Sequence, residues 1–338
     1  MMFKTLPHAA TAWTRDGRLY AFLAAAGFSL KAIFVKLAYQ SHPIEPLTLL
    51  ALRMAFALPL FLWLIWKSRT PDSRPLSRGD AGRIWMLALL GYYLSSLFDF
   101  HGLTYISAGL ERMILYLYPT MVLLLDACRT RKAPSARTWL AMAVCYAGLA
   151  IAFGHDLRQA GQGIDVLKGA AWVFASAVTY ALYYLGTGDM VKRMGSMRLA
   201  GLAGSASCAL VLGHFLLFGH PGELPQLPAD IYGWSLLMAV LSTALPIYWL
   251  ALAIQRLGAP QAAAVGTLGP VLTVLAAWIM LDESLSLLQL AGLGLVMLGV
   301  TRLKPAGPAR PAAASPMPAA PAAPLTPPVP STPQARPS

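Results

Sequence analysis

Charged side chains inside apolar stretches are the residues of this sequence best suited to chemistry. Lys31, Arg53 and Asp99 each interrupt a long apolar run. A charge at the centre of a membrane helix costs about 2.5–3.5 kcal/mol on insertion scales, so each one needs a compensating role. At 1.5 Å per helical residue, all three fall about 10–12 Å below one boundary of their stretches. We therefore expect Asp99 to pair with Lys31 or Arg53 beside a central cavity, leaving one positive charge for a carboxylate or phosphate.

Other interpretations of these charges stay open. The pair could be an architectural salt bridge that fixes helix register. Asp99 or His101 could carry a coupling proton, but the two lie on different faces of a helix, which favours a packing role for His101. Glu111 and Arg112 are adjacent in an expected turn. A local ion pair is the default there, and a gate latch is the alternative.

Aromatic residues and prolines supply further candidates. Tyr116, Tyr180 and Tyr184 lie nearest the middle of their stretches. We expect them to line the cavity because tyrosine joins an apolar ring to a polar tip, although packing or an interfacial position would also suit them. Pro119 and Pro270 are expected to kink their helices, because proline removes one backbone hydrogen bond.

Composition sets the class of protein. The 338 residues are 57% hydrophobic and 12% charged, with a mean hydropathy of +0.58, which excludes a soluble globular enzyme. The net charge of +12 lies in short runs between apolar stretches, so nucleic-acid binding is not expected. The three cysteines and six histidines show no metal spacing, and P-loop and HExxH motifs are missing from the sequence. We expect no cofactor, no metal and no catalytic residue.

The apolar stretches predict an all-α integral membrane protein. A bilayer core of about 30 Å needs roughly 20 apolar residues per helix. The first run is expected to be an uncleaved helix because Lys31 and Lys36 interrupt it, and a signal peptide is the alternative. By the length criterion we expect ten transmembrane helices, over residues 19–38, 46–66, 83–107, 110–128, 137–154, 168–188, 199–218, 231–253, 260–281 and 286–303.

The basic residues predict the topology. With the N-terminus in the cytoplasm, 20 of the 26 Lys and Arg residues fall on the cytoplasmic side. Only Lys36, Arg112, Arg158 and Lys168 fall outside. This bias places both termini in the cytoplasm of a multi-pass protein, which we expect in a bacterial inner membrane. Residues 1–18 form a cytoplasmic N-terminus, and the Pro- and Ala-rich residues 304–338 are expected to be a disordered cytoplasmic tail.

The two halves of the chain resemble each other. A shift of 151 positions brings Pro119 onto Pro270 and Gly148 onto Gly299 without a gap. Each copy would hold five helices, over residues 19–154 and 168–303. Because five is odd, the second copy would enter the bilayer in the opposite direction, giving two inverted five-helix repeats as in many secondary transporters.

Several stretches resemble the EamA-type transporters of the drug/metabolite transporter superfamily. They are residues 33–38 (IFVKLA), 53–57 (RMAFA), 102–120 (GLTYISAGLERMILYLYPT), 252–270 (LAIQRLGAPQAAAVGTLGP) and 289–299 (QLAGLGLVMLG), with Asp282 and Glu283. The chain departs from the family pattern at Lys31, at Gly27-Phe28 where a tryptophan is expected, and at Lys132 where an acidic residue is expected.

The resemblance implies a secondary transporter that works by alternating access without ATP. It implies export of a small organic metabolite, such as an amino acid or organic anion, from a cavity between the repeats. The partners would be that small molecule and the lipid bilayer. A membrane-embedded enzyme acting on lipid, an ion channel or a scaffold are the alternatives.

Overall fold

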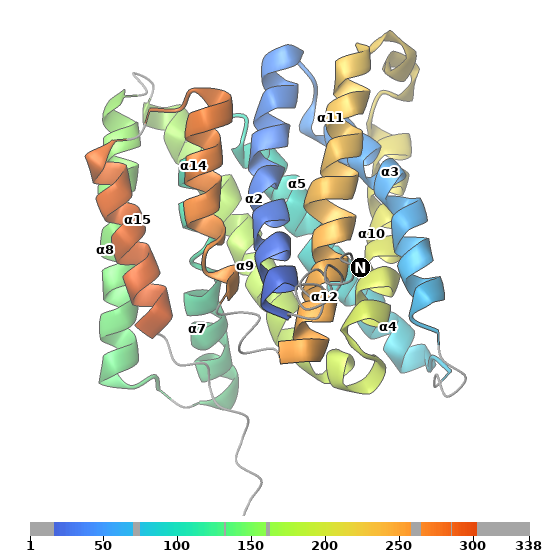
Figure 1. Ribbon diagram of the computed structural model, residues 1–338, viewed down its shortest axis with the longest axis horizontal. Coiled ribbons are helices and arrows are strands. Elements are labelled where there is room, and N and C mark those ends of the chain that lie inside the picture. The colour runs from blue at the N-terminus through green and yellow to red at the C-terminus, as the bar shows by residue number, and fades with distance from the viewer. Residues whose placement is uncertain are drawn as a thin grey trace, which may run out of the picture. The chain divides into compact units, whose positions relative to one another are not determined.

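The regular elements of the protein are helical. The computed structural model describes residues 17–69, 75–131, 133–159, 163–257, 265–284 and 286–302. These residues form helices, and none of them forms a strand (Figure 1). Lys132 and the tail at 304–338 lie outside the described residues, and the tail belongs to a second unit that begins at Pro305.

The first half of the chain runs from α2 to α8. Its elements are α2 (Gly17–Ser41), α3 (Pro46–Lys67), α4 (Arg78–Leu87), the π-helix η1 (Ala88–Leu94), α5 (Ser95–Gly102), α6 (Ala108–Leu115), α7 (Tyr118–Thr130) and α8 (Ala136–Gln159).

The second half repeats this order from α9 onward. Its elements are α9 (Gly163–Met194), α10 (Ser196–Phe218), the 3₁₀ helix η2 (Pro221–Gln226), α11 (Ala229–Ala239), the π-helix η3 (Val240–Ala244), α12 (Leu245–Leu257), α14 (Gly269–Leu281) and α15 (Leu287–Arg302).

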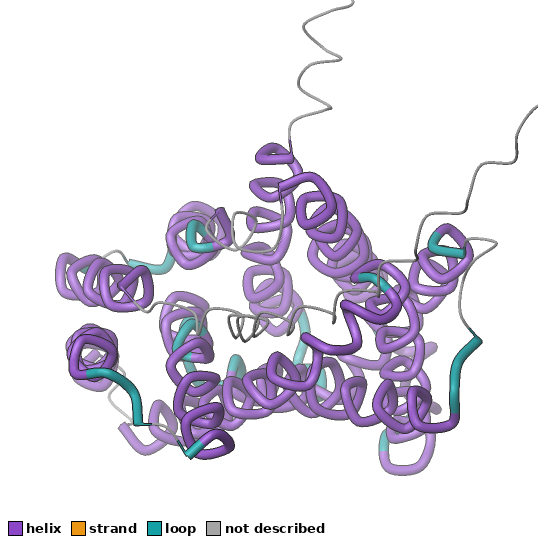
Figure 2. The backbone as a smooth tube through the Cα atoms, turned by 90° about the horizontal axis from the view of Figure 1, so that it is seen from below, coloured by secondary structure: helices purple, strands orange, loops and turns teal. Residues whose placement is uncertain are grey.

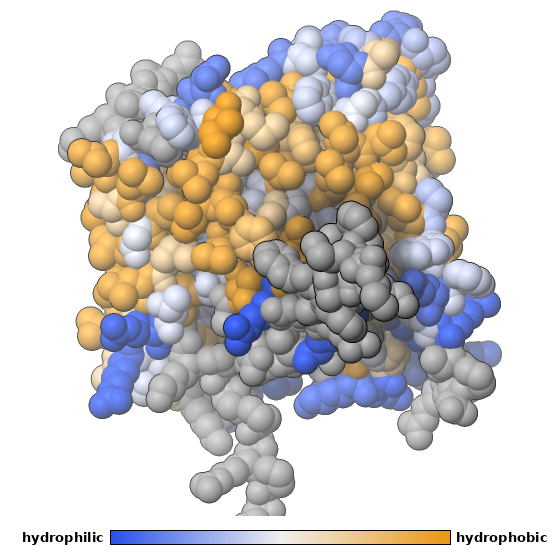
Figure 3. All heavy atoms as spheres, in the orientation of Figure 1, coloured by the Kyte–Doolittle hydropathy of each residue, from blue (hydrophilic) through white to orange (hydrophobic). Residues whose placement is uncertain are grey.

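The helices have the length and polarity that a bilayer requires. Among the described residues, seven helical segments are long and apolar enough to cross a membrane, and α14 and α15 are shorter apolar helices. Helical segments overlap every range that the sequence analysis assigns to a span. Figure 3 shows a belt of apolar side chains around the middle of the visible face, with polar side chains at its two ends. A lipid environment explains why large side chains such as Trp66 (68% exposed) and Leu217 (78%) lie on the surface.

The offset of 151 residues found in the sequence also relates the helices. Shifted by 151, α7 coincides with α14, and the first residues of α4 and α8 fall on those of α11 and α15. The π-helices η1 and η3 occupy equivalent positions as well. Arg131 and Asp282, also 151 apart, end α7 and α14 in the same left-handed conformation, with φ of 54° and 53°. The two halves therefore share one backbone plan.

Equivalent helices pack antiparallel. A Cβ added to Gly148 of α8 would lie 2.5 Å from the carbonyl oxygen of Gly292, and one added to Gly299 of α15 would lie 2.6 Å from that of Ala141. Between these contacts, Cys145 donates to the carbonyl of Val296 at 3.6 Å. Because later residues of α8 meet earlier residues of α15, the repeats are inverted relative to each other, and close approach at small residues holds the crossing together.

The helix α2, which carries Lys31, and its counterpart α9 occupy equivalent places in the bundle. The helix α2 packs against α12 and α14, and its counterpart α9 packs against α5 and α7. Seen at 90° to Figure 1, the backbone is a bundle of helices viewed largely along their axes (Figure 2). The π-helices lie within these contacts, since η3 packs against α2 and η1 packs against α9.

The helix α4 begins with a capping box ahead of its apolar residues. The Asp80 amide donates to the Ser77 hydroxyl, and the Ser77 amide donates to the Asp80 carboxylate. Arg193 of α9 adds an ion pair to Asp80 at 3.1 Å. The hydrogen bonds from Ser77, with a smaller contribution from Arg193, lower the pKa of Asp80. These contacts join the start of α4 to the end of α9.

Candidate functional site

Opposite charges meet in the interior where α2, α5 and α6 converge. The Nζ atom of Lys31 lies 2.6 Å from Oδ2 of Asp99 and 3.6 Å from Oε1 of Glu111. The Asp99 side chain is 1% exposed and that of Glu111 is fully buried. Of the two partners expected for Asp99, the structure selects Lys31.

Arg112 extends this group of charges. Its Nε atom lies 3.9 Å from Oε2 of Glu111, and its Nη2 atom donates to the carbonyl of Phe28 at 2.7 Å. The expected ion pair between Glu111 and Arg112 is thus present, within a larger group. We call Lys31, Asp99, Glu111 and Arg112 the charge cluster.

The sequence analysis did not connect Glu111 to Lys31 because it placed Glu111 in a turn. In the structure α6 starts at Ala108, and Glu111 faces inward within its first turns. The signal that could have shown this is Ser107, whose side chain accepts a hydrogen bond from the Leu110 amide. A serine directly before an apolar run is typical of a helix N-cap.

Arg53 occupies a separate buried place beside the π-helix η3. Its Nε atom donates to the hydroxyl of Thr243 at 3.0 Å, and its guanidinium lies 5.5 Å from the ring centre of Phe100. Its Nη1 atom is buried and has no hydrogen-bond partner among the described residues. Arg53 is therefore not the direct partner of Asp99.

The second repeat has no equivalent of these charges. The positions 151 residues after Lys31, Asp99 and Arg53 hold Leu182, Leu250 and Gly204, and those after Glu111 and Arg112 hold alanines. At the described positions among these, Leu182, Gly204 and Leu250, the same backbone plan therefore forms without charged side chains. Since apolar replacements of buried ion pairs are often neutral or stabilising, the fold alone does not account for the charge cluster.

The predicted tyrosines come together around a residue that the sequence analysis did not select. The ring of Tyr118 lies 6.4, 5.0 and 5.5 Å from the rings of Tyr116, Tyr180 and Tyr184. Tyr183 lies 5.6 Å from Tyr180. This tyrosine cluster borders the charge cluster, because the backbone amide of Tyr116 donates to the carbonyl of Arg112 at 3.0 Å.

The 151-residue shift relates tyrosines of the tyrosine cluster to small residues. The residues equivalent to Tyr118 and Tyr180 are Gly269 and Ser29, and the Ser29 hydroxyl donates to the Gly269 carbonyl at 2.9 Å. Thr273 also donates to the carbonyl of Ser29, at 3.3 Å. Two equivalent helix pairs thus differ, since α2 and α14 meet through backbone and small side chains while α9 and α7 meet through aromatic rings.

Pro119 and Pro270 lie in the first turns of helices. Each follows a short break, after α6 for Pro119 and directly before α14 for Pro270. The expected kink is therefore an interruption, and each proline takes a position where its missing N–H leaves no helical bond unmade. The Thr120 hydroxyl donates to the Leu117 carbonyl at 2.7 Å within the first of these breaks.

Glu283 and Lys36 tie the start of α6 to its neighbours. The Glu283 carboxylate accepts from the backbone amides of Ala108 at 2.8 Å and Gly109 at 3.3 Å. Lys36 donates to the carbonyls of Leu103 and Ile106 in the connection before α6, at 3.3 and 3.0 Å. A carboxylate at a helix N-terminus interacts favourably with the exposed amides and the helix dipole. The second repeat thereby holds the helix that carries Glu111.

His101 stands apart from the charge cluster. Its Nδ1 atom is 2.9 Å from the Leu97 carbonyl, and its ring lies 5.3 Å from that of Trp172. It borders a pocket of about 490 Å³ together with residues of α3, α9 and α10. This arrangement agrees with the packing role that the sequence favours.

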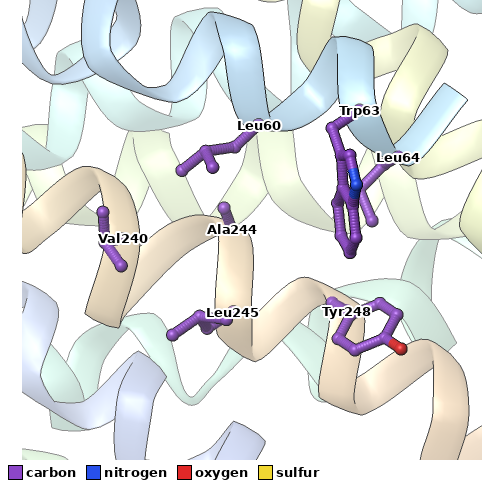
Figure 4. Close-up of a pocket in the computed structure, with 7 residues that line it drawn as sticks. All are labelled: Leu60, Trp63, Leu64, Val240, Ala244, Leu245 and Tyr248. Atoms are coloured by element: carbon purple, nitrogen blue, oxygen red, sulfur yellow. The ribbon is translucent and has the colours of Figure 1, made fainter. Parts of the chain in front are cut away.

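A second hollow is lined mainly by apolar side chains. This cavity of about 50 Å³ is bordered by Leu60, Trp63 and Tyr248 with their neighbours on α3, η3 and α12 (Figure 4). Neither hollow is lined by the charge cluster. Within the described part of the chain, groups of three or more His, Cys, Asp or Glu that could hold a metal are not found.

Comparisons with known proteins agree with this architecture. Residues 16–154 and residues 167–303 each match the EamA-like transporter family. A protein of Bacillus subtilis (strain 168), named Uncharacterized transporter YcbK, is 32% identical over 297 residues, which cover 85% of this chain and 92% of that protein. Uncharacterized transporter sll1319 of Synechocystis sp. is 24% identical over 318 residues, covering 85% of this chain and 92% of its own.

A solved structure shares the fold. It is titled "Crystal structure of protein" and aligns with a TM-score of 0.60, covering 85% of this chain and 95% of its own. Because only 17% of the aligned residues are identical, this likeness concerns the fold alone.

Proposed function

Because the chain belongs to the EamA-like transporter family, we propose that it is a secondary transporter that exports a small organic metabolite, an amino acid or organic anion, by alternating access. The proposal includes ten membrane crossings with both termini in the cytoplasm of a bacterial inner membrane. It also divides the chain into a cytoplasmic N-terminus at 1–18, repeats at 19–154 and 168–303, and a cytoplasmic tail at 304–338. Membership of a transporter family favours transport over catalysis.

The observation that carries this proposal is the position of the charge cluster in one repeat only. Asp99 and Glu111 are buried, and Lys31 and Arg112 are half-buried, at positions where the second repeat has apolar residues. Buried ionisable groups inside a membrane protein typically mark the path of a substrate or ion. Arg112 adjoins the tyrosine cluster, so a metabolite with one anionic group and an apolar body would find a partner for each part.

The unequal helix pairs support alternating access. In a carrier built from inverted repeats, each state has one of two equivalent interfaces closed and the other loosened. The contact of α2 with α14 through Ser29 and Gly269 and the contact of α9 with α7 through tyrosine rings are such a pair. If each helix pair took on the arrangement of the other, the site would open to the opposite side of the membrane.

Counterflow in proteoliposomes tests the proposal. Vesicles containing the purified protein are loaded with one unlabelled metabolite from a panel of amino acids and organic anions, and entry of the labelled compound is measured. We expect transient accumulation that saturates with concentration for at least one compound, and none in protein-free vesicles. An enzyme would show neither accumulation nor saturation of flux, and a channel would show flux that does not saturate. Folded protein that gives no counterflow with any compound would contradict the proposal.

A further inference from the structure

The two carboxyl groups of the charge cluster lack the donors that two carboxylates require. One ammonium group joins them, since the Nζ atom of Lys31 lies 2.6 Å from Oδ2 of Asp99 and 3.6 Å from Oε1 of Glu111, and the two carboxyl groups also interact with each other. Apart from their ion pairs, the oxygen atoms of both groups are buried without a hydrogen-bond partner among the described residues. An ionised carboxylate can only accept hydrogen bonds, so neither group can donate to the other. One proton on the pair would turn their contact into an O–H···O hydrogen bond, which is short and strong when one partner is charged.

The other charges that face this pair are already engaged. Lys31 on α2 lies between the two carboxyls, and Arg112 lies on the far side of Glu111. Lys36 bonds to carbonyls before α6, and Arg53 on α3 bonds to Thr243. From α9 Tyr180 interacts with Arg112, and past α14 the Glu283 carboxylate is bound to backbone amides. On α8, Tyr146 is engaged with the Thr120 hydroxyl at 3.2 Å.

We propose that Asp99 and Glu111 share one proton and that this proton crosses the membrane together with an anionic substrate bound at Arg112. The proposal rests on the transport function proposed above and adds the coupling ion to it. With both carboxyls ionised, the charge cluster is neutral, because Lys31 and Arg112 balance them. One shared proton leaves a single positive charge, which an anion neutralises. The proton and the anion therefore favour each other's binding, which is reciprocal by thermodynamic linkage.

Arg112 is the place where the anion and the proton would meet. Its Nη2 atom is held by the Phe28 carbonyl, whereas its Nε atom is buried without a hydrogen-bond partner among the residues described. An anionic group that takes this donor weakens the hold of Arg112 on Glu111. Glu111 then depends on the shared proton for its contact with Asp99. In each cycle one proton would enter the pair from one side with the anion and leave on the other side.

Infrared spectroscopy tests the shared proton without any substrate. The reconstituted full-length protein is recorded at neutral pH in H₂O and D₂O, and the C=O band of a protonated, buried carboxylic acid is followed. We expect this band in the wild type, its loss in Glu111→Gln and in Asp99→Asn, and its retention in Glu111→Asp. Asp126→Asn is the control, since Asp126 is partly exposed and paired with Arg129 outside the cluster. Absence of the band in the wild type, or its persistence in either neutral variant, would overturn the proposal.

Proton movement tests the coupling. Vesicles that hold a pH-sensitive dye receive a metabolite that passes the counterflow test, and proton entry is recorded as that metabolite enters. We expect protons to move with the metabolite in the wild type, and Glu111→Gln to lower the number of protons that accompany each metabolite molecule toward zero, whatever its rate of metabolite entry. Proton movement in the opposite direction, none in the wild type, or unchanged movement in Glu111→Gln would overturn the coupling. If no metabolite is carried, the transport proposal fails, and the infrared result still decides whether the pair holds a proton.

Discussion

Removal of Lys31 leaves two buried carboxyl groups without their shared cation. At 2.6 Å from Asp99 and 3.6 Å from Glu111, and with an effective dielectric constant of about 20, the one negative charge that the pair keeps attracts Lys31 by about 5–6 kcal/mol before desolvation. Desolvation offsets much of this, and loss of one partner of a buried pair typically costs about 3–5 kcal/mol. We expect Lys31→Met to lower the free energy of unfolding by that amount. Asp99→Asn should lower the free energy of unfolding by less, about 1–3 kcal/mol, because Lys31 still has its ion pair with Glu111.

The double variant shows whether the two residues act as a pair. Lys31→Met with Asp99→Asn removes both charges, so its cost should fall short of the sum of the single costs by about 2–3 kcal/mol. The assay is equilibrium unfolding of the purified protein in mixed micelles, followed by circular dichroism. The matched control is the exposed pair of Lys168 and Asp165 on α9, at 3.2 Å, for which we expect a coupling of about 0–1 kcal/mol. Costs of the two cluster variants that add within about 0.5 kcal/mol would refute the pairing.

Three further predictions concern the frame around the charge cluster. Gly292→Ala should lower the free energy of unfolding by about 1–3 kcal/mol, because the new Cβ would lie 2.6 Å from a carbonyl oxygen of α8. Gly294→Ala on the same helix is the control. Its Cβ would meet nothing within 4 Å, so the same unfolding assay should show no change. Glu283→Gln should cost about 1 kcal/mol by weakening the cap of α6, and a thermal midpoint equal to that of the wild type would contradict the cap. The pKa of Asp80 is lower in the folded protein than in the unfolded chain. The ionised Asp80 carboxylate therefore stabilises the fold at pH values above its unfolded pKa of about 3.9. This stabilisation is lost as the pH falls through the pKa of Asp80 in the folded protein. The difference in thermal midpoint between wild type and Asp80→Asn should accordingly shrink from neutral pH toward about pH 3, and a difference that grows on acidification would contradict the assignment.

Much of the fold follows from the sequence because it depends on patterns that a bilayer enforces. Apolar length predicts where helices lie, and the match of Pro119 to Pro270 and of Gly148 to Gly299 predicts a repeat that the backbone reproduces. The opposite direction of the copies follows from an odd number of helices per copy, and the antiparallel crossing of α8 and α15 agrees with it.

The site could be predicted only in part because it depends on side-chain direction and exact helix starts. The common depth of Lys31 and Asp99 allowed their pairing to be predicted, but depth alone could not separate Lys31 from Arg53 as the partner. The sequence analysis placed Glu111 in a turn, whereas the structure places it, buried, in the first turn of α6, which starts at Ala108. The pattern of apolar residues does not reveal where an α-helix widens into the π-helices η1 and η3. The contact of Arg53 with Thr243 on η3 could therefore not be predicted.

Counterflow by the double variant, Lys31→Met with Asp99→Asn, tests most directly whether the charge cluster is the transport site of a carrier. The wild type and the control Lys168→Met are measured in the same vesicles with the same metabolite, after unfolding data have shown that all three proteins are folded. The account predicts saturable counterflow by the wild type and the control, and none by the double variant. Counterflow by the double variant at the wild-type rate would show that the cluster only supports the fold. Absence of counterflow by the wild type with every compound would show that the chain is not such a carrier.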